Sequence, residues 1–414
     1  MPRILILLIF LFSINFAQQK RSWNTNKAPS DFFFEFINVN EDSSNLLLLF
    51  KTTYDQLYFA KAGNEFQSGL ILNVEIRDSL DFVLRKSKKV ELAITDFNLT
   101  NSKIHFVEFY LKFLLPKGSY KSFLNVELLN SNRSENFFGQ DIIIKDDEAI
   151  YQPICVFQQS DNTEKYSLAN FGGIIPFTEK PLELFFPYNL DSLYSPIEIS
   201  IIQNDKVIFH SLINTVKQLE LKESDGKIFL SPSIKGKRYL QISNFNPKLH
   251  EGTIRIELSS SKSKIFFDKE VKWISKPSSL NNLEKAIELL KHIEKPEVVE
   301  NLLALDEEIY LKEFYKYWLK FDSDTSNVFN DAMNEFYQRI DYADKHFSVF
   351  NKKEGSSTDR GKIFIKYGLP DEIKRYYSKL DSVKEVWFYK NLNLKFSFVD
   401  NSGTGNYLLM GSNE

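Results

Sequence analysis

The sequence predicts a multidomain, mainly β protein: two β-sandwich-like domains, then a helical segment and a small C-terminal α+β module. Three observations predict this order. Apolar and polar residues alternate as far as residue 276, helical spacing replaces the alternation after Pro277, and strand-like runs return after Gly355. With 414 residues, 43% hydrophobic and 26% charged, the chain is long enough for several globular cores.

Residues 1–17 are expected to be a signal peptide. Arg3 precedes a continuous apolar run over residues 4–12, which continues weakly to Ala17. This run is shorter than the about 20 residues that cross a bilayer as a helix. We expect cleavage after Ala17, or retention as an N-terminal anchor where cleavage fails. No later stretch resembles a membrane span, so the expected location is the periplasm or the outer surface of the envelope.

Residues 18–148 are expected to form the first β-sandwich. Leu70, Leu72 and Val74 alternate with Asn73 and Glu75, a pattern typical of strands that bury one face. Turn-forming clusters separate such runs, with no helical pattern between them. For the basic segment 85–89 we expect a solvated hairpin rather than a nucleic-acid surface. The formal net charge of -3 also offers no general attraction to nucleic acid.

Residues 149–276 are expected to form a second sandwich, because alternating runs recur at 197–201 and 254–258. One larger sandwich with a long insertion is the alternative. Cys155 is the only cysteine, which excludes an internal disulfide and a Cys-based zinc site. Its apolar neighbours predict a small buried side chain.

Residues 277–352 are expected to be helical. The sequence predicts one helix capped by Ser278 or Ser279 and ended by Pro296, and a second capped by Asp306. A third shows apolar residues at steps of four and three over 329–347, so the three stripes predict a shared core.

The segment Asp322-Ser323-Asp324-Thr325 resembles the beginning of a calcium loop. It lacks the glycine and the final glutamate of such a loop. We therefore expect a helix N-cap at Asp324 or Thr325.

Residues 353–414 are expected to form the α+β module. Strands are predicted at 363–367, 386–389, 394–399 and 407–410, with a short helix within 370–380. Gly361 and Gly368 bracket the first predicted strand. Asp371 and Glu372 suit the positive end of the predicted helix.

The most distinctive segment is GSSTDRGKIFIKYGLPDEI at 355–373. Together with NEFYQRIDYA at 334–343 and EVWFY at 385–389, it resembles the GWxTD domain of exported proteins from Bacteroidota and related bacteria, over about 305–414. Ser356 stands where that family has tryptophan. The resemblance implies no activity. It implies a set of motif residues with a structural or binding role: Gly355, Thr358, Asp359, Arg360, Gly361, Tyr367, Gly368, Pro370, Asp371, Glu372 and Trp387.

Asp359 and Arg360 are expected to form a structural ion pair or to fix the preceding turn, since a carboxylate beside a guanidinium is normally ionised and held. The sequence contains no Gly-x-Ser-x-Gly nucleophile motif, no phosphate-binding glycine loop and no histidine pair at metal-ligand spacing. We therefore assign no catalytic, cofactor or metal site.

The expected function is that of an exported cell-envelope protein, a non-catalytic protein–protein interaction or structural module. Its expected partners are other envelope proteins, and nucleic acid is not among them. The alternative is an envelope hydrolase with a site near the GWxTD-like motif. Convergent acids in a deep pocket near Asp359 would favour the hydrolase.

Overall fold

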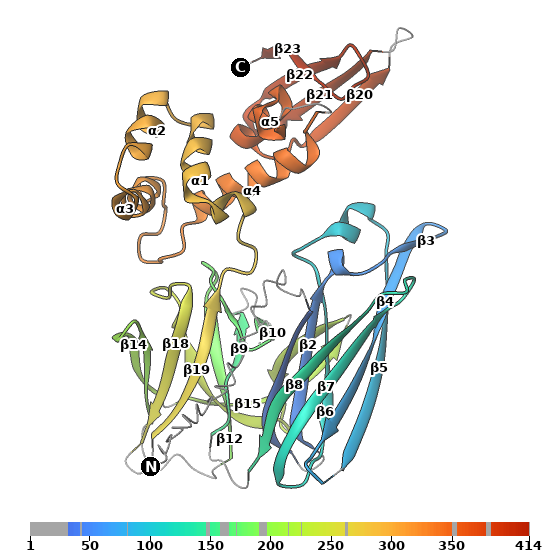
Figure 1. Cartoon of the computed structure of the whole chain (residues 1–414), viewed down its shortest axis with the longest axis vertical. Helices are drawn as coiled ribbons and strands as arrows, with labels where there is room; N and C mark the ends of the chain where they lie inside the picture. Colours follow the sequence, from blue (N-terminus) through green and yellow to red (C-terminus); the bar gives the residue numbers. More distant parts are fainter. Residues whose placement is uncertain are drawn as a thin grey trace, which may run out of the picture. The chain divides into compact units, whose positions relative to one another are not determined.

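The computed structural model describes residues 32–41, 44–80, 82–145, 150–157, 165–170, 172–189, 197–213, 215–224, 226–260, 264–349, 354–377 and 382–413. The protein is mostly β, with a helical segment within 283–367 and a β-rich C-terminal module (Figure 1). The predicted fold class is confirmed. The expected signal peptide lies outside the described residues. Among the helices that are described, none has the length and apolar character needed to span a bilayer.

The first β region contains two sheets. A three-stranded sheet has the order β1-β2-β6; a five-stranded sheet has the order β3-β4-β7-β8, with β5 paired to β4. Side chains from both sheets form one core that includes Phe50, Leu72 and Phe109. The basic segment 85–89 lies in β5, which pairs antiparallel with the preceding strand β4 as a hairpin, and most of its side chains are exposed, so the expected solvated hairpin is confirmed. The strands are β1 (Phe32–Glu41), β2 (Ser44–Thr53), β3 (Ala60–Ala62), β4 (Glu65–Arg77), β5 (Val83–Ile94), β6 (Phe106–Phe113), β7 (Gly118–Leu128) and β8 (Ser134–Ile144).

The second β region contains a closed barrel of order β10-β16-β15-β17-β12-β9 and a five-stranded sheet of order β11-β19-β18-β13-β14. Alternation along the chain did not predict the closure. Cys155 is buried as expected, and burial raises the pKa of its thiol. The strands are β9 (Ile154–Phe157), β10 (Tyr166–Leu168), β11 (Ile175–Pro176), β12 (Leu182–Tyr188), β13 (Ile197–Gln203), β14 (Lys206–Ile213), β15 (Val216–Ser224), β16 (Lys227–Pro232), β17 (Lys237–Ser243), β18 (Gly252–Ser259) and β19 (Lys264–Lys272).

Four helices are described within residues 277–352, where the sequence predicted three. Pro296 is the first residue of α2, a position where its missing N–H is not needed. Asn282, rather than Ser278 or Ser279, caps α1 through a 2.9 Å bond from the Lys285 N–H. The helices are α1 (Leu283–Leu289), α2 (Pro296–Leu303), α3 (Glu307–Trp318), α4 (Asp331–His346) and α5 (Asp359–Tyr367).

The expected N-cap at Asp324 or Thr325 was also wrong. Asp324 accepts the Ser326 N–H at 3.0 Å in a local turn. Helix α4 begins later, where the Asn330 side chain accepts the Met333 N–H at 2.8 Å.

The C-terminal sheet is antiparallel, with the order β20-β21-β22-β23. Two predictions in this module were wrong. Residues 363–367 belong to helix α5, in which Gly361, Phe364 and Ile365 are buried at helical spacing. Residues 372–377 form a strand rather than a helix, because they pair with β21. The strands are β20 (Glu372–Tyr377), β21 (Val383–Tyr389), β22 (Leu394–Asp400) and β23 (Leu408–Asn413).

The helices and the C-terminal sheet share one core, and this core reaches back to the end of β19. Trp273 packs against Phe329 with ring centroids 5.1 Å apart, and Phe177 lies 5.1 Å from the same ring. At the other end of the core, Trp387 packs against Phe398 at 5.0 Å. The rings from α3, α4 and the sheet therefore form a single apolar cluster.

Candidate functional site

The GWxTD-like motif forms a tight turn followed by the start of α5. A short 3-10 helix spans Gly355–Ser357, and Thr358 is the N-cap of α5. The Thr358 hydroxyl accepts the Gly361 N–H at 3.1 Å and donates to the Gly355 carbonyl at 2.6 Å. The threonine thus satisfies one free N–H of the first turn and closes the turn before it.

Two motif glycines allow main chains to approach closely. A Cβ at Gly355 would lie 1.9 Å from the Ala343 carbonyl oxygen of α4. A Cβ at Gly361 would lie 1.9 Å from the Gly355 carbonyl oxygen. Any side chain at either position would displace the main chain, so these glycines fix α4, the turn and α5 together.

Asp359 and Arg360 face different partners, so the expected ion pair between them is not what the structure shows. The Asp359 carboxylate accepts the Leu409 N–H of β23 at 2.9 Å. The Arg360 guanidinium lies 3.5 Å from the Glu385 carboxylate and donates to the Gly405 carbonyl at 3.3 Å. Each residue therefore ties the start of α5 to the C-terminal sheet or its loop.

Glu385 is the centre of this network and is only 1% exposed. It accepts the Trp387 indole N–H at 2.7 Å and the Arg375 Nε–H at 2.8 Å, in addition to its contact with Arg360. The bond from Arg375 to Glu385 raises the pKa of Arg375. The charge-assisted bonds compensate the cost of burying the carboxylate.

Two aromatic rings also contact the Arg360 guanidinium. It lies 3.9 Å from the centroid of the Tyr407 ring and 5.1 Å from that of Phe347. Burial lowers the pKa of Arg360, and Glu385 opposes that shift. The arrangement braces α5 against the sheet.

The remaining motif residues form the corner between α5 and β20. Tyr367 packs against Phe396 with ring centroids 5.3 Å apart. Gly368 ends α5 at a φ of 77°, which favours glycine, and its carbonyl accepts the Tyr389 hydroxyl at 2.9 Å. Asp371 accepts the Lys390 N–H at 2.6 Å. Two more motif residues complete the corner: half-buried Pro370, and Glu372, which pairs with Lys374 and Lys390.

Ser356, where the family has tryptophan, is fully buried. Its N–H donates to the Asp344 carboxylate at 2.7 Å, and its hydroxyl has no hydrogen-bond partner among the described residues. In this chain the position is therefore an interior one and contributes nothing to the surface.

The motif brings its residues together as a structural brace. Its ionised groups bind each other or the main chain, and no cluster of three metal-ligand side chains occurs in the described ranges. The sequence analysis did not single out Glu385 or Arg375. The alternation in EVWFY could have revealed Glu385, because it places this residue on the same face of the strand as Trp387.

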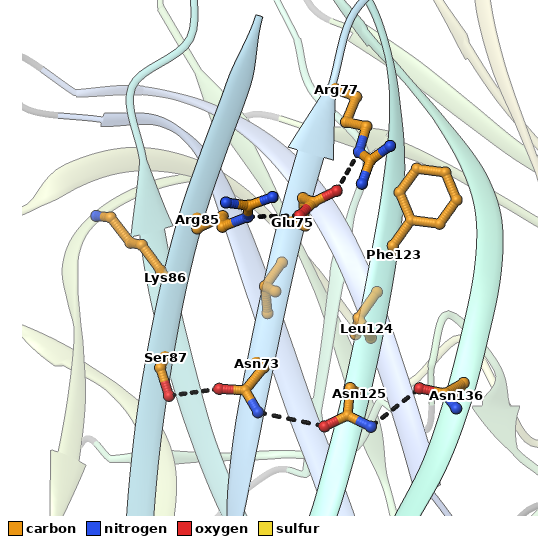
Figure 2. A pocket seen from close by; sticks show the side chains of 11 residues that line it. Asn73, Glu75, Arg77, Arg85, Lys86, Ser87, Phe123, Leu124, Asn125 and Asn136 are labelled. Carbon is orange, nitrogen blue, oxygen red and sulfur yellow. Dashed lines mark hydrogen bonds and ion pairs between the residues drawn. The ribbon is translucent and has the colours of Figure 1, made fainter. Parts of the chain in front are cut away.

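A second candidate site lies on the outer face of the sheet formed by β5, β4, β7 and β8. This face is hollowed to about 630 Å³, and its side chains come from all four strands (Figure 2). Sequence reasoning placed Asn73 and Glu75 on the solvent-facing side of a strand and assigned no role to the depression. The repeated asparagines Asn73, Asn125 and Asn136 were the available signal.

Comparisons with known proteins identify the C-terminal part of the chain. The GWxTD domain family model matches residues 270–414. No curated protein matches the sequence significantly. Among solved structures, the titin Ig tandem domains A164-A165 match at 9% identity over 58% of this chain and 95% of that chain. The TM-score is 0.13, so this similarity supports no inference. The chain is thus a GWxTD domain-containing protein, with the domain at residues 270–414.

Proposed function

We propose that this chain is an exported cell-envelope protein, and that its GWxTD domain is a non-catalytic module that binds another envelope protein. The observation that carries the proposal is the outer face of the C-terminal sheet. In the described part of the chain this face combines exposed apolar side chains with lysines. The motif on the inner side supports a scaffold role, because its ionised groups brace α5 against the sheet.

Strand pairing defines the outer face. Residues 374, 386 and 397 lie side by side across β20, β21 and β22, as do residues 376, 384 and 399. Tyr376 is 52% exposed, and Leu408 and Met410 of the neighbouring β23 are 44% and 67% exposed. Lys374 and Lys395 lie over the Phe388 ring at 5.3 and 5.7 Å from its centroid.

The positive charge of this face indicates that its partner is acidic. Three lysines, Lys374, Lys384 and Lys395, accompany one acid, Glu372, which is bridged by Lys374 and Lys390. An acidic segment with some apolar residues complements such a surface. Strands β20 and β23 end the described sheet. An extended acidic segment of another envelope protein can therefore add beside one of them as a further strand.

The hydrolase alternative gains no support from the motif. Asp359 accepts a main-chain N–H and Arg360 contacts Glu385, so the polar groups of the motif are directed at each other. A general acid or base needs an accessible position beside a substrate.

Charge reversal on the outer face tests the proposal. Lys374→Glu is compared with Lys222→Glu: each lysine is 48% exposed and pairs with a glutamate two residues earlier in its strand, at 3.2 and 3.7 Å. Proteins captured from an envelope extract are quantified for each variant, and a captured protein is then purified for direct titration. We expect its affinity to fall about tenfold or more in Lys374→Glu only.

Equal loss in both variants, or no direct binding to any purified candidate, would overturn the binding proposal. Export is tested separately by cell fractionation with N-terminal sequencing of the mature protein. The expected first residue is Gln18, and recovery in the cytoplasm would refute export.

A further inference from the structure

The outer-face depression of the first β region offers side-chain groups without offering main-chain groups. Eight of its eleven lining residues are polar or charged. The main chains of β4 and β7 are paired on both sides, so they are occupied by the sheet. The volume of about 630 Å³ falls within the usual range of ligand sites, about 300–1,000 Å³.

One row of the depression is a chain of side-chain amides across the four strands. The Ser87 hydroxyl donates to Asn73 at 2.8 Å, Asn73 donates to Asn125 at 3.2 Å, and Asn125 donates to Asn136 at 2.9 Å (Figure 2). These bonds orient each amide in advance of any ligand.

The amides keep hydrogen-bonding capacity toward the solvent. An amide has two N–H donors and an oxygen with two lone pairs. In its bonds to the described residues, Asn125 uses one N–H and one lone pair, which leaves one of each. An adjacent donor and acceptor in one plane match a pair of neighbouring hydroxyls, since a hydroxyl both donates and accepts.

The next row carries positive charge. Arg77 and Arg85 both bind the Glu75 carboxylate through Nε, the second at 2.5 Å. No terminal guanidinium nitrogen of either residue is hydrogen-bonded to a described residue. The Arg77 guanidinium also lies over the Phe123 ring, 5.2 Å from its centroid. Two cations share one carboxylate, so the row has a net positive charge and guanidinium groups suited to bidentate binding of a carboxylate.

We infer that this face binds an acidic oligosaccharide, with the asparagine row holding ring hydroxyls and the terminal nitrogens of Arg77 and Arg85 holding sugar carboxylates. Glu75, which binds both guanidinium groups, and Arg85 opposite it are two residues from the asparagine row along β4, or about 7 Å in a strand, and Arg77 lies two residues further on. Four strands at about 4.8 Å spacing give the row a length of about 14 Å, enough for roughly two or three linked rings. Hydroxyls and carboxylates of neighbouring rings therefore reach both rows together.

A peptide fits this face less well. Extended peptides bind sheets mainly through main-chain hydrogen bonds at an exposed edge. The depression lies on a face where the main-chain groups are already paired. The site is also separate from the C-terminal sheet, so failure of either binding proposal leaves the other standing.

Titration calorimetry of the purified protein tests the inference. The probes are oligogalacturonate, oligomannuronate and hyaluronan oligosaccharides, each of about six rings and so longer than the row. Neutral cello-oligosaccharides and poly-glutamate are the comparison ligands. Asn125→Ala removes the centre of the amide row, and Arg85→Gln removes one cation.

Arg133→Gln is the matched control for Arg85→Gln. Arg133 is 43% exposed and paired with Glu135, as Arg85 is 70% exposed and paired with Glu75, but Arg133 does not line the depression. Since Arg85 is exposed, its replacement leaves the core intact. For Asn125→Ala, a thermal unfolding curve checks that the variant is still folded.

We expect at least one acidic oligosaccharide to bind, with affinity about tenfold or more weaker in Asn125→Ala and Arg85→Gln and unchanged in Arg133→Gln. Absence of binding by the whole acidic panel overturns the inference. So does equal weakening by Arg133→Gln. Binding of poly-glutamate as tight as that of the sugars, unaffected by Asn125→Ala, would show a charged patch without sugar recognition.

Discussion

Replacing Glu385 by glutamine should destabilise the C-terminal core more than any other single-charge change in the GWxTD motif network. The carboxylate is 1% exposed and has three partners: Trp387 at 2.7 Å, Arg375 at 2.8 Å and Arg360 at 3.5 Å. Glutamine keeps the shape but removes the charge, so Arg360 is left without its counter-ion in a position where its side chain is 11% exposed.

The expected loss is about 3 kcal/mol of unfolding free energy. A hydrogen bond to a charged group contributes about 1.5–3 kcal/mol. The amide oxygen can still accept from Trp387, so one such bond and the Arg360 contact are lost. Removal of one partner from a buried ion pair costs about 3–5 kcal/mol. We take the lower end of this range because the Arg375 side chain is 56% exposed.

Urea unfolding followed by tryptophan fluorescence measures the loss. The three described tryptophans, Trp273, Trp318 and Trp387, all lie in the core shared by the helices and the C-terminal sheet. Glu372→Gln is the control: Glu372 also contacts two cations, Lys374 at 3.2 Å and Lys390 at 3.1 Å, but it is 37% exposed. That substitution should cost much less than Glu385→Gln, because exposed ion pairs contribute little to stability. Equal costs for the two variants would refute burial as the source of the difference.

Three further outcomes follow from single residues. Gly361→Ala should lower the free energy of unfolding by about 3 kcal/mol in the same urea assay, because the new Cβ would lie 1.9 Å from the Gly355 carbonyl oxygen. The control is Gly411→Ala, whose Cβ would have nothing within 4 Å and which should cost under about 1 kcal/mol. Similar losses in the two variants would contradict this packing. Burial lowers the pKa of His292 from its usual 6.5 to about 4. Between these two pH values the unfolded state therefore binds more protons than the folded state, so the free energy of unfolding should fall as the pH drops from about 6.5 to 4. After discounting for partial exposure, we expect a fall of about 1–2 kcal/mol that His292→Gln abolishes; parallel pH profiles of wild type and variant would exclude this group. Cys155, whose thiol pKa is raised by burial, should react with a thiol reagent at pH 8 about a hundredfold faster in urea than in the folded protein, and rapid labelling when folded would contradict its burial.

Alternation predicted several strands of both β regions because one face of those strands is buried, as Leu70, Leu72 and Val74 show in β4. It gave no signal for β12, which is buried at every position. It failed at 363–367, where Ile363, Phe364 and Ile365 resemble a short buried strand. Such short apolar runs do not distinguish strand from helix. The Thr358 cap and the acidic first turn were the missing evidence.

The candidate sites were predictable only in part. The motif residues were found by resemblance, but their partners depend on contacts between segments far apart in the chain. Asp359 bonds to Leu409, and Arg360 contacts Glu385. The amide row of the first sheet depends on register: Asn73, Asn125 and Asn136 meet because β4, β7 and β8 pair at these residues. Loop lengths and turn geometry set that register, and alternation alone does not.

The Trp273 contact also bears on how such a domain can pass between proteins by recombination. A crossover at Pro277, where the helical pattern begins, would separate Trp273 from Phe329 and leave the helical core without that ring. The family match begins at residue 270, within β19. A domain that begins at residue 270 includes Trp273, although it also takes the last residues of β19 from the neighbouring sheet. The unit that can be exchanged therefore follows the packing of side chains rather than the change from strand to helix.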